Sequence, residues 1–123
     1  MKLLLDTHAF LWWDTNDARL PETLRFAIAS PENEVFVSAV TVWEIAIKRT
    51  SGKLNFGRPV GKAIKDHGFL PIPITVEHAE WTGRLPQLHR DRFDRLLVAQ
   101  AQLEGLILAT VDEEILRYQV PHL

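Results

Sequence analysis

Short apolar runs alternate with amphipathic stretches along the whole chain. The segments 2–6, 35–38 and 106–110 each contain a continuous apolar run, which is typical of strands that are buried on both faces of a parallel sheet. Between them, apolar residues recur three and four positions apart, a spacing that predicts helices. The predicted helices cover residues 7–14, 21–30, 39–50, 59–66, 75–85, 91–104 and 111–118.

This order of elements predicts an α/β fold with three layers, α/β/α, around a central parallel sheet. A further extended segment, residues 70–74, contains Pro71 and Pro73, which place it at an edge of the sheet or in a connection. In parallel sheets, functional residues collect at the carboxyl ends of the strands. Asp6 follows the first strand and Asp112 the third, so we expect both at one cleft.

Length and composition limit the possible classes of protein. A chain of 123 residues predicts a single domain, residues 1–123, with a core that needs no cross-links. The absence of cysteine excludes disulfides and thiolate metal sites, and it is consistent with a cytoplasmic protein. No apolar run has the length of a signal peptide or a membrane span. With a net charge of −2, binding of nucleic acid through bulk positive charge is not expected, but contact with phosphate through bound cations remains open.

Four acidic residues are candidates for chemistry, and each of them has an ordinary structural explanation when it is taken alone. Asp6 could cap the following helix, although Thr7 could do so in its place. Glu44 could form a surface ion pair with Lys48, one helical turn away. Asp112 precedes a helix whose first turn is acidic, and acids there favour the helix dipole.

Asp94 is the least ordinary of the four. Asp91 is the expected N-cap of its helix, and Asp94 could simply occupy the third helical position, where acids favour the helix dipole. The turns after Asp94, however, are apolar nearly all round, which predicts a buried helix. A buried carboxylate needs a partner, for example Arg95 or a metal ion. Four converging carboxylates would repel one another unless cations lay between them. Oxygen ligands without cysteine favour Mg²⁺ or Mn²⁺.

The chain resembles PIN-domain proteins, and more narrowly the VapC-type toxins of bacterial toxin–antitoxin pairs. The matching segments are LLLDTHAFLWW at the start, VSAVTVWEIAIK in the middle, HRDRFDRLLVAQA, and LATVDEEI near the end. These segments occur in the order and spacing of the family and cover the whole chain. One position departs from the pattern, because close relatives commonly have proline where this chain has Arg92.

The resemblance implies a PIN-like fold and a metal-dependent endoribonuclease that cleaves RNA with a metal-activated water. It implies that Asp6, Glu44, Asp94 and Asp112 form the catalytic site and bind Mg²⁺ or Mn²⁺, with Asp6 and Asp94 as the main ligands. It also implies a cytoplasmic toxin of a type II (VapBC-type) system, with a small cognate antitoxin that blocks the acidic groove. Homodimers and toxin–antitoxin hetero-oligomers are the expected assemblies.

Two other functions use the same residues. A non-catalytic PIN-like binding module would use the acidic groove only to receive a basic partner peptide. A phosphatase of the haloacid dehalogenase type also begins with a strand that ends in aspartate. That class needs a second aspartate two positions later, where this chain has His8, which argues against it.

Several other polar and aromatic residues have both a structural and a functional explanation. Three hydroxyl residues at predicted strand ends are candidates to steady a carboxylate or to cap a helix: Thr7, Ser38 and Thr110. None of the five histidines shows the spacing of a ligand pair. A basic cluster, Lys48, Arg49 and Lys53, is either a solvated helix end or a rail for the RNA backbone. The four tryptophans are expected in the core or at partner contacts rather than stacked on RNA bases.

Overall fold

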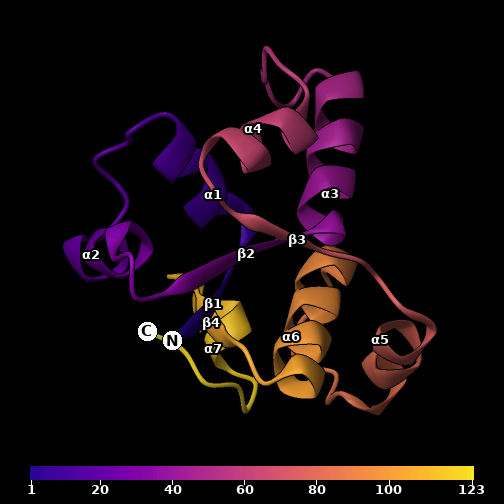
Figure 1. Cartoon of the computed structure of the whole chain (residues 1–123). Coiled ribbons are helices and arrows are strands. Elements are labelled where there is room, and N and C mark those ends of the chain that lie inside the picture. Colours follow the sequence, from indigo (N-terminus) through magenta and orange to yellow (C-terminus); the bar gives the residue numbers. More distant parts are fainter.

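Four parallel strands form one sheet in the computed structural model, which describes residues 1–123 (Figure 1). The strands are β1 (Lys2–Leu5), β2 (Glu34–Ser38), β3 (Leu70–Ile72) and β4 (Ile107–Ala109). They lie in the order β3-β2-β1-β4, and all neighbours pair in parallel. The predicted parallel sheet is confirmed, and β3, which contains Pro71, lies at its edge as its sequence predicts.

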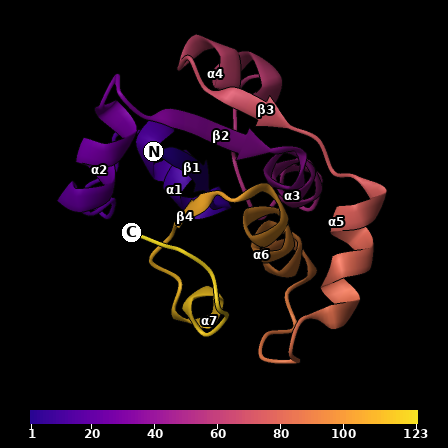
Figure 2. The same ribbon diagram turned by 60° about the horizontal axis from the view of Figure 1, so that its bottom comes forward.

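Helices cover both faces of this sheet. They are α1 (Thr7–Asp14), α2 (Glu22–Ala29), α3 (Ala39–Thr50), α4 (Val60–Asp66), α5 (Val76–Trp81), the 3-10 helix η1 (Thr82–Arg84), α6 (Arg92–Glu104) and α7 (Glu113–Leu116). Figure 2 shows α2 and α4 on one side of the sheet and α6 and α7 on the other. The predicted three-layer α/β/α fold is therefore confirmed. No helix combines the length and the apolar character that crossing a membrane requires.

The alternation of side chains along the central strands divides the core into two parts. Leu3 and Leu5 of β1 and Val37 of β2 belong to a cluster of 16 buried residues, which α1, α2 and α4 complete. Leu4 points to the opposite face and belongs to a cluster of 12 buried residues with α6 and α7. Because all three leucines of β1 are fully buried, this strand holds the residue that follows it, Asp6, in a fixed position.

Two helices are shorter than their sequence predicts. The helix expected over residues 75–85 is α-helical only as far as Trp81, and η1 continues it as a tighter turn. The helix expected over residues 111–118 is reduced to the single turn of α7. The chain after α7 folds back onto β4, where the Leu108 amide donates to the Pro121 carbonyl at 2.8 Å.

The carboxyl ends of the central strands bring residues from both ends of the chain together. Leu5 pairs with Ala109, and the Asp6 amide donates to the Ala109 carbonyl at 3.2 Å. The first turn of α6 is held against α3 by the edge-to-face contact of Phe93 with Trp43, whose ring centroids are 4.8 Å apart. Acidic residues from four elements therefore approach the same edge.

Candidate active site

Asp6 caps α1 with one carboxylate oxygen and directs the other toward Thr110, at the end of β4. Its Oδ1 accepts a hydrogen bond from the Ala9 amide at 2.8 Å, and its Oδ2 accepts one from the Thr110 hydroxyl at 2.5 Å. The expectation that Thr7 could replace it as the cap is wrong. Burial raises the pKa of Asp6, and these two hydrogen bonds offset only part of that rise. Thr110 steadies this carboxylate, which is one of the roles that its position at a strand end suggested.

Glu44 is buried, with an exposed fraction of 5%. Its Oε1 accepts a hydrogen bond from the Thr7 hydroxyl at 2.6 Å, and its Oε2 pairs with Lys48 Nζ at 2.6 Å. The predicted ion pair with Lys48 is therefore present, but its expected place on the surface is wrong. The Thr7 hydroxyl also lies 3.2 Å from the Thr41 hydroxyl, so a small hydrogen-bond network between α1 and α3 orients the Glu44 carboxylate.

Asp94 lies in the first turn of α6, where Asp91 is the N-cap as predicted. The Asp91 side chain accepts hydrogen bonds from two backbone amides, including that of Asp94 at 3.0 Å. Asp94 Oδ2 lies 2.8 Å from His89 Nε2. Arg95, the partner suggested by the sequence, instead donates to the Thr82 carbonyl at 2.6 Å. Burial raises the pKa of Asp94 to about 7, the contact with His89 opposes this rise, and the charges of Asp91 and Asp112 add to it.

Asp112 follows β4 and caps α7. Its Oδ1 accepts a hydrogen bond from the Glu114 amide at 2.9 Å, and its own amide donates to the Thr110 hydroxyl at 3.0 Å. Thr110 thus links the two acids that follow β1 and β4. The capping explanation holds for Asp112 as it does for Asp6, but capping occupies only one of the carboxylate oxygens in each.

One pocket of about 140 Å³ collects these side chains. No hydrophobic residue lines it; the lining residues are Asp6, Thr7, His8, Glu44, Lys48, His89, Asp91, Asp94 and Asp112. The structure brings all four predicted acids to this pocket, and Asp6 and Asp94 therefore face the same space. We call it the acidic pocket.

His89 is the residue of the acidic pocket that the sequence did not single out. One ligand atom from each of His89, Asp94 and Asp112 lies within 4.8 Å of the others, close enough to surround one metal ion. A pairwise search for histidines at helical spacing misses it, because its partners are acids. The available signal is its place in the loop five residues before Asp94, just ahead of the helix cap.

The donor set of this pocket fits a divalent cation. Asp94 and Asp112 offer carboxylate oxygens and His89 a ring nitrogen, while Asp6 has both oxygens fixed by hydrogen bonds from the protein. Glu44 is less available, because Lys48 neutralises it. Burial, together with the charges of Asp91 and Asp112, raises the pKa of Asp94, and a bound cation would favour its charged form.

The basic cluster beyond Glu44 is mostly engaged within the protein. Lys48 pairs with Glu44, and Arg49 donates to the carbonyls of Phe56 and Arg58 at 3.1 and 3.2 Å. Of the cluster, only Lys53 extends into solvent without an ion pair or side-chain hydrogen bond. The cluster thus serves mainly to hold the helix end and the following loop. Ser38 caps α3, as expected from its position.

Comparison with known proteins identifies the family. The PIN domain family matches residues 3–121, and no curated protein matches the chain significantly in sequence. Similar solved structures include VapBC2 from Rickettsia felis bound to a promoter DNA fragment (TM-score 0.72, 14% identity, 100% of this chain and 98% of that chain). Also similar is DNA-bound VapBC from Salmonella typhimurium (TM-score 0.69, 17% identity, 100% of this chain and 97% of that chain). FitAcB from Neisseria gonorrhoeae is similar as well (TM-score 0.63, 18% identity, 98% of this chain and 95% of that chain). The TM-scores show a shared fold, and the family match over nearly the whole chain establishes that this protein belongs to the PIN domain family.

Proposed function

We propose that the protein is a metal-dependent endoribonuclease and the toxin of a type II, VapBC-type toxin–antitoxin system. The observation that carries the proposal is the acidic pocket, a polar cavity of about 140 Å³ that is lined by Asp6, Glu44, Asp94 and Asp112. Membership of the PIN domain family, whose members are generally nucleases, supports the same conclusion.

Mg²⁺ or Mn²⁺ is the cation that we propose for this pocket. Carboxylate oxygens dominate the donor set, and hard oxygen ligands suit these ions. Asp6, Asp94 and Asp112 would hold the cation, and His89 adds one nitrogen ligand. When bound, the cation would make water a better nucleophile and offset the charge of the phosphodiester under attack.

The protein's own residues would position the reaction. Thr110 and the Ala9 amide fix both oxygens of Asp6, so this carboxylate needs no reorganisation when a cation arrives. Glu44 is oriented by Thr7 and charge-balanced by Lys48. In the resting pocket Lys48 therefore limits the charge repulsion, and its ammonium lies where a substrate phosphate would also be attracted.

A small cognate antitoxin is the partner that we propose for this chain. Several similar solved structures are complexes named VapBC or FitAB, and some of them contain DNA. A basic side chain of the antitoxin would compensate the charge of the acidic pocket in place of the metal. Cytoplasmic localisation and a homodimer of the free toxin are further parts of the proposal.

The test is cleavage of RNA by the purified chain with Mg²⁺ or Mn²⁺ and with EDTA. We expect cleavage only with the metal, and its loss in Asp6→Asn and Asp94→Asn. Asp66→Asn, which removes an exposed acid of α4 that pairs with surface cations, is the matched control and should cleave normally. Cleavage that persists in EDTA, or in both site variants, contradicts the proposal. If Mn²⁺ fails to bind in calorimetry and no RNA is cut, the chain is instead a binding module.

A further inference from the structure

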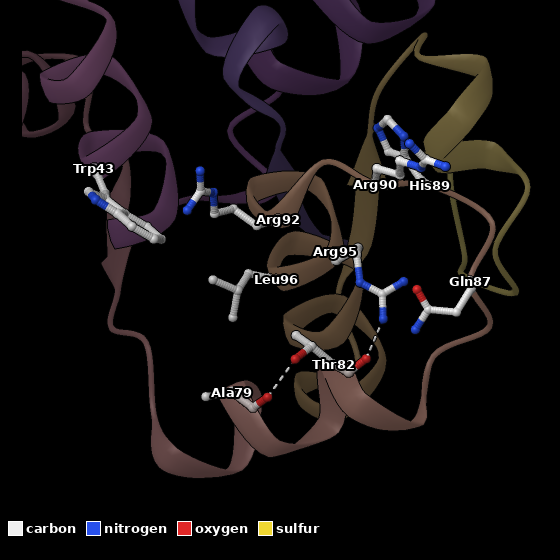
Figure 3. A pocket seen from close by; sticks show the side chains of 9 residues that line it. All are labelled: Trp43, Ala79, Thr82, Gln87, His89, Arg90, Arg92, Arg95 and Leu96. Carbon is white, nitrogen blue, oxygen red and sulfur yellow. Dashed lines mark hydrogen bonds between the residues drawn. The ribbon is translucent and has the colours of Figure 1, made fainter.

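A second pocket, of about 380 Å³, lies beside the acidic pocket and has the opposite charge (Figure 3). It is bounded by α3, by the end of α5 with η1, and by the loop that leads into α6. Arg90, Arg92 and Arg95 contribute to its wall, and no acidic residue does. We call it the arginine pocket. In a protein with a net charge of −2, three guanidinium groups around one hollow are a local feature rather than a reflection of overall composition.

Two of these guanidinium groups are free to bind a ligand. Arg95 is committed to the fold, because it donates to the carbonyls of Thr82 and Pro86 and to the Tyr118 hydroxyl. Arg90 and Arg92 are exposed, and neither forms an ion pair or a side-chain hydrogen bond in the structure. Figure 3 shows Arg92 extending toward the side of the pocket where Trp43 lies. A fork of unpaired guanidinium donors matches the oxygens of a phosphate group.

Trp43 gives the arginine pocket an aromatic wall. Its side chain is 40% exposed, although an exposed indole is costly for a protein to leave uncovered. The edge-to-face contact with Phe93 orients the ring, and Leu96 adds an apolar floor between α3 and η1. A fixed, half-exposed indole next to free cations is the combination that binds single-stranded nucleic acid, through base stacking and phosphate contacts.

His89 connects the two pockets. It lines the arginine pocket and also the acidic pocket, where its Nε2 contacts Asp94. Arg90 is its neighbour in the chain, and Arg92 begins the helix that carries Asp94. A polyanion held by Arg90 and Arg92 would therefore continue directly into the acidic pocket.

We propose that the arginine pocket binds the single-stranded RNA substrate next to the bond that is cut, with Arg90 and Arg92 on two phosphates of its backbone and an unpaired base against Trp43. This inference rests on the proposed function for the identity of the substrate. It assigns Trp43 an RNA contact, in contrast to the core or partner contact that its sequence suggested. A duplex cannot use the same site fully, because its bases are already stacked and paired.

The test separates binding from cleavage by measuring binding in EDTA, where the proposed reaction cannot proceed. The probe is a fluorescent single-stranded RNA oligonucleotide, and its affinity is measured by anisotropy over a range of salt concentrations. For the double variant Arg90→Gln/Arg92→Gln we expect the slope of log affinity against log salt to fall by about 1.4, since each single-strand phosphate contact contributes about 0.7. For Trp43→Leu we expect affinity to fall by about fivefold to a hundredfold, with recovery in Trp43→Phe.

Arg84→Gln is the matched control. Arg84 is exposed, has no acidic partner and lies over the Trp81 ring at 5.3 Å, much as Arg92 lies over Phe93 at 5.8 Å, but it lines a different pocket. The inference is overturned if Arg84→Gln lowers the salt slope as much as the double variant does, or if the wild-type chain does not bind the probe. It is also overturned if Trp43→Leu changes the mass measured by light scattering, because Trp43 then covers a second copy of the chain.

These outcomes remain distinct from those of the proposed function. If the wild-type chain cuts RNA with metal but the variants bind RNA normally in EDTA, the nuclease proposal stands and the arginine pocket is not its substrate site. If the variants lose binding while no condition yields cleavage, the pocket binds RNA and the nuclease proposal fails.

Discussion

Replacing Asp94 with asparagine should stabilise the metal-free protein even though it removes cleavage. Burial raises the pKa of Asp94 from 3.8 to about 7, with neighbouring acids adding to the rise. The folded state therefore binds more protons than the unfolded state between about pH 4 and pH 7, and its stability falls as the pH rises through that range. The change corresponds to at most about 4 kcal/mol above pH 7. Partial access of water to the side chain lowers the expected effect to about 1–3 kcal/mol.

The assay is urea unfolding in EDTA at pH 5 and pH 8. Asp94→Asn keeps an oxygen that can contact His89, so the gain in its free energy of unfolding over the wild type should be larger at pH 8 than at pH 5. Adding Mn²⁺ at pH 8 should stabilise the wild type and leave the variant nearly unchanged, because only the wild type binds the ion. An equal difference at both pH values, or a variant less stable than the wild type at pH 8, would refute the reasoning.

Three further changes test other parts of the structure. Thr110→Val removes the hydroxyl that holds Asp6 and should lower metal affinity or cleavage about 10- to 100-fold. Thr110→Ser should restore them, and Mn²⁺ titration and RNA cleavage measure the two effects. Asp14→Ala removes the part-buried carboxylate that contacts both Arg58 and His67, so that Arg58 keeps only the exposed Asp66 as an acidic partner. It should lower the free energy of unfolding in urea by about 1–3 kcal/mol at pH 7. Gly105→Ala places a side chain at φ +66° after α6 and should cost about 1 kcal/mol in the same assay.

Local patterns predicted most of the fold. The apolar runs that became β1, β2 and β4 needed only their own residues to be recognised, because a strand covered on both faces has no polar side. Helix bounds followed from caps and stops, as with Asp91 before α6 and Gly105, with its positive φ, after it. The helix predicted over residues 111–118 was too long, because α7 ends at Leu116 and the chain after it returns to β4, where the Leu108 amide bonds to a residue 13 positions later. No local pattern carries that information.

The candidate site was only partly predictable for a related reason. The four acids could be listed from the sequence, because carboxylates at strand ends and on a buried helix are unusual in themselves. Whether each was a cap or faced a common pocket was left open, and Asp6 and Asp112 turned out to do both. His89 was missed because its partners are acids rather than a second histidine, and one of them, Asp112, lies far away in the sequence.

The sequence by itself determined the order of strands and helices, the parallel sheet and the identity of the acids, since periodicity, caps and strand ends are properties of adjacent residues. Only the tertiary structure decided which charged groups are buried and which remain free. It buried Glu44 with its predicted partner Lys48, tied Arg95 to backbone carbonyls, and left Arg90 and Arg92 unpaired beside Trp43. The physical reason is that burial and pairing depend on how α3, α6 and the loop before it pack together, and free energies of charges change steeply with that packing.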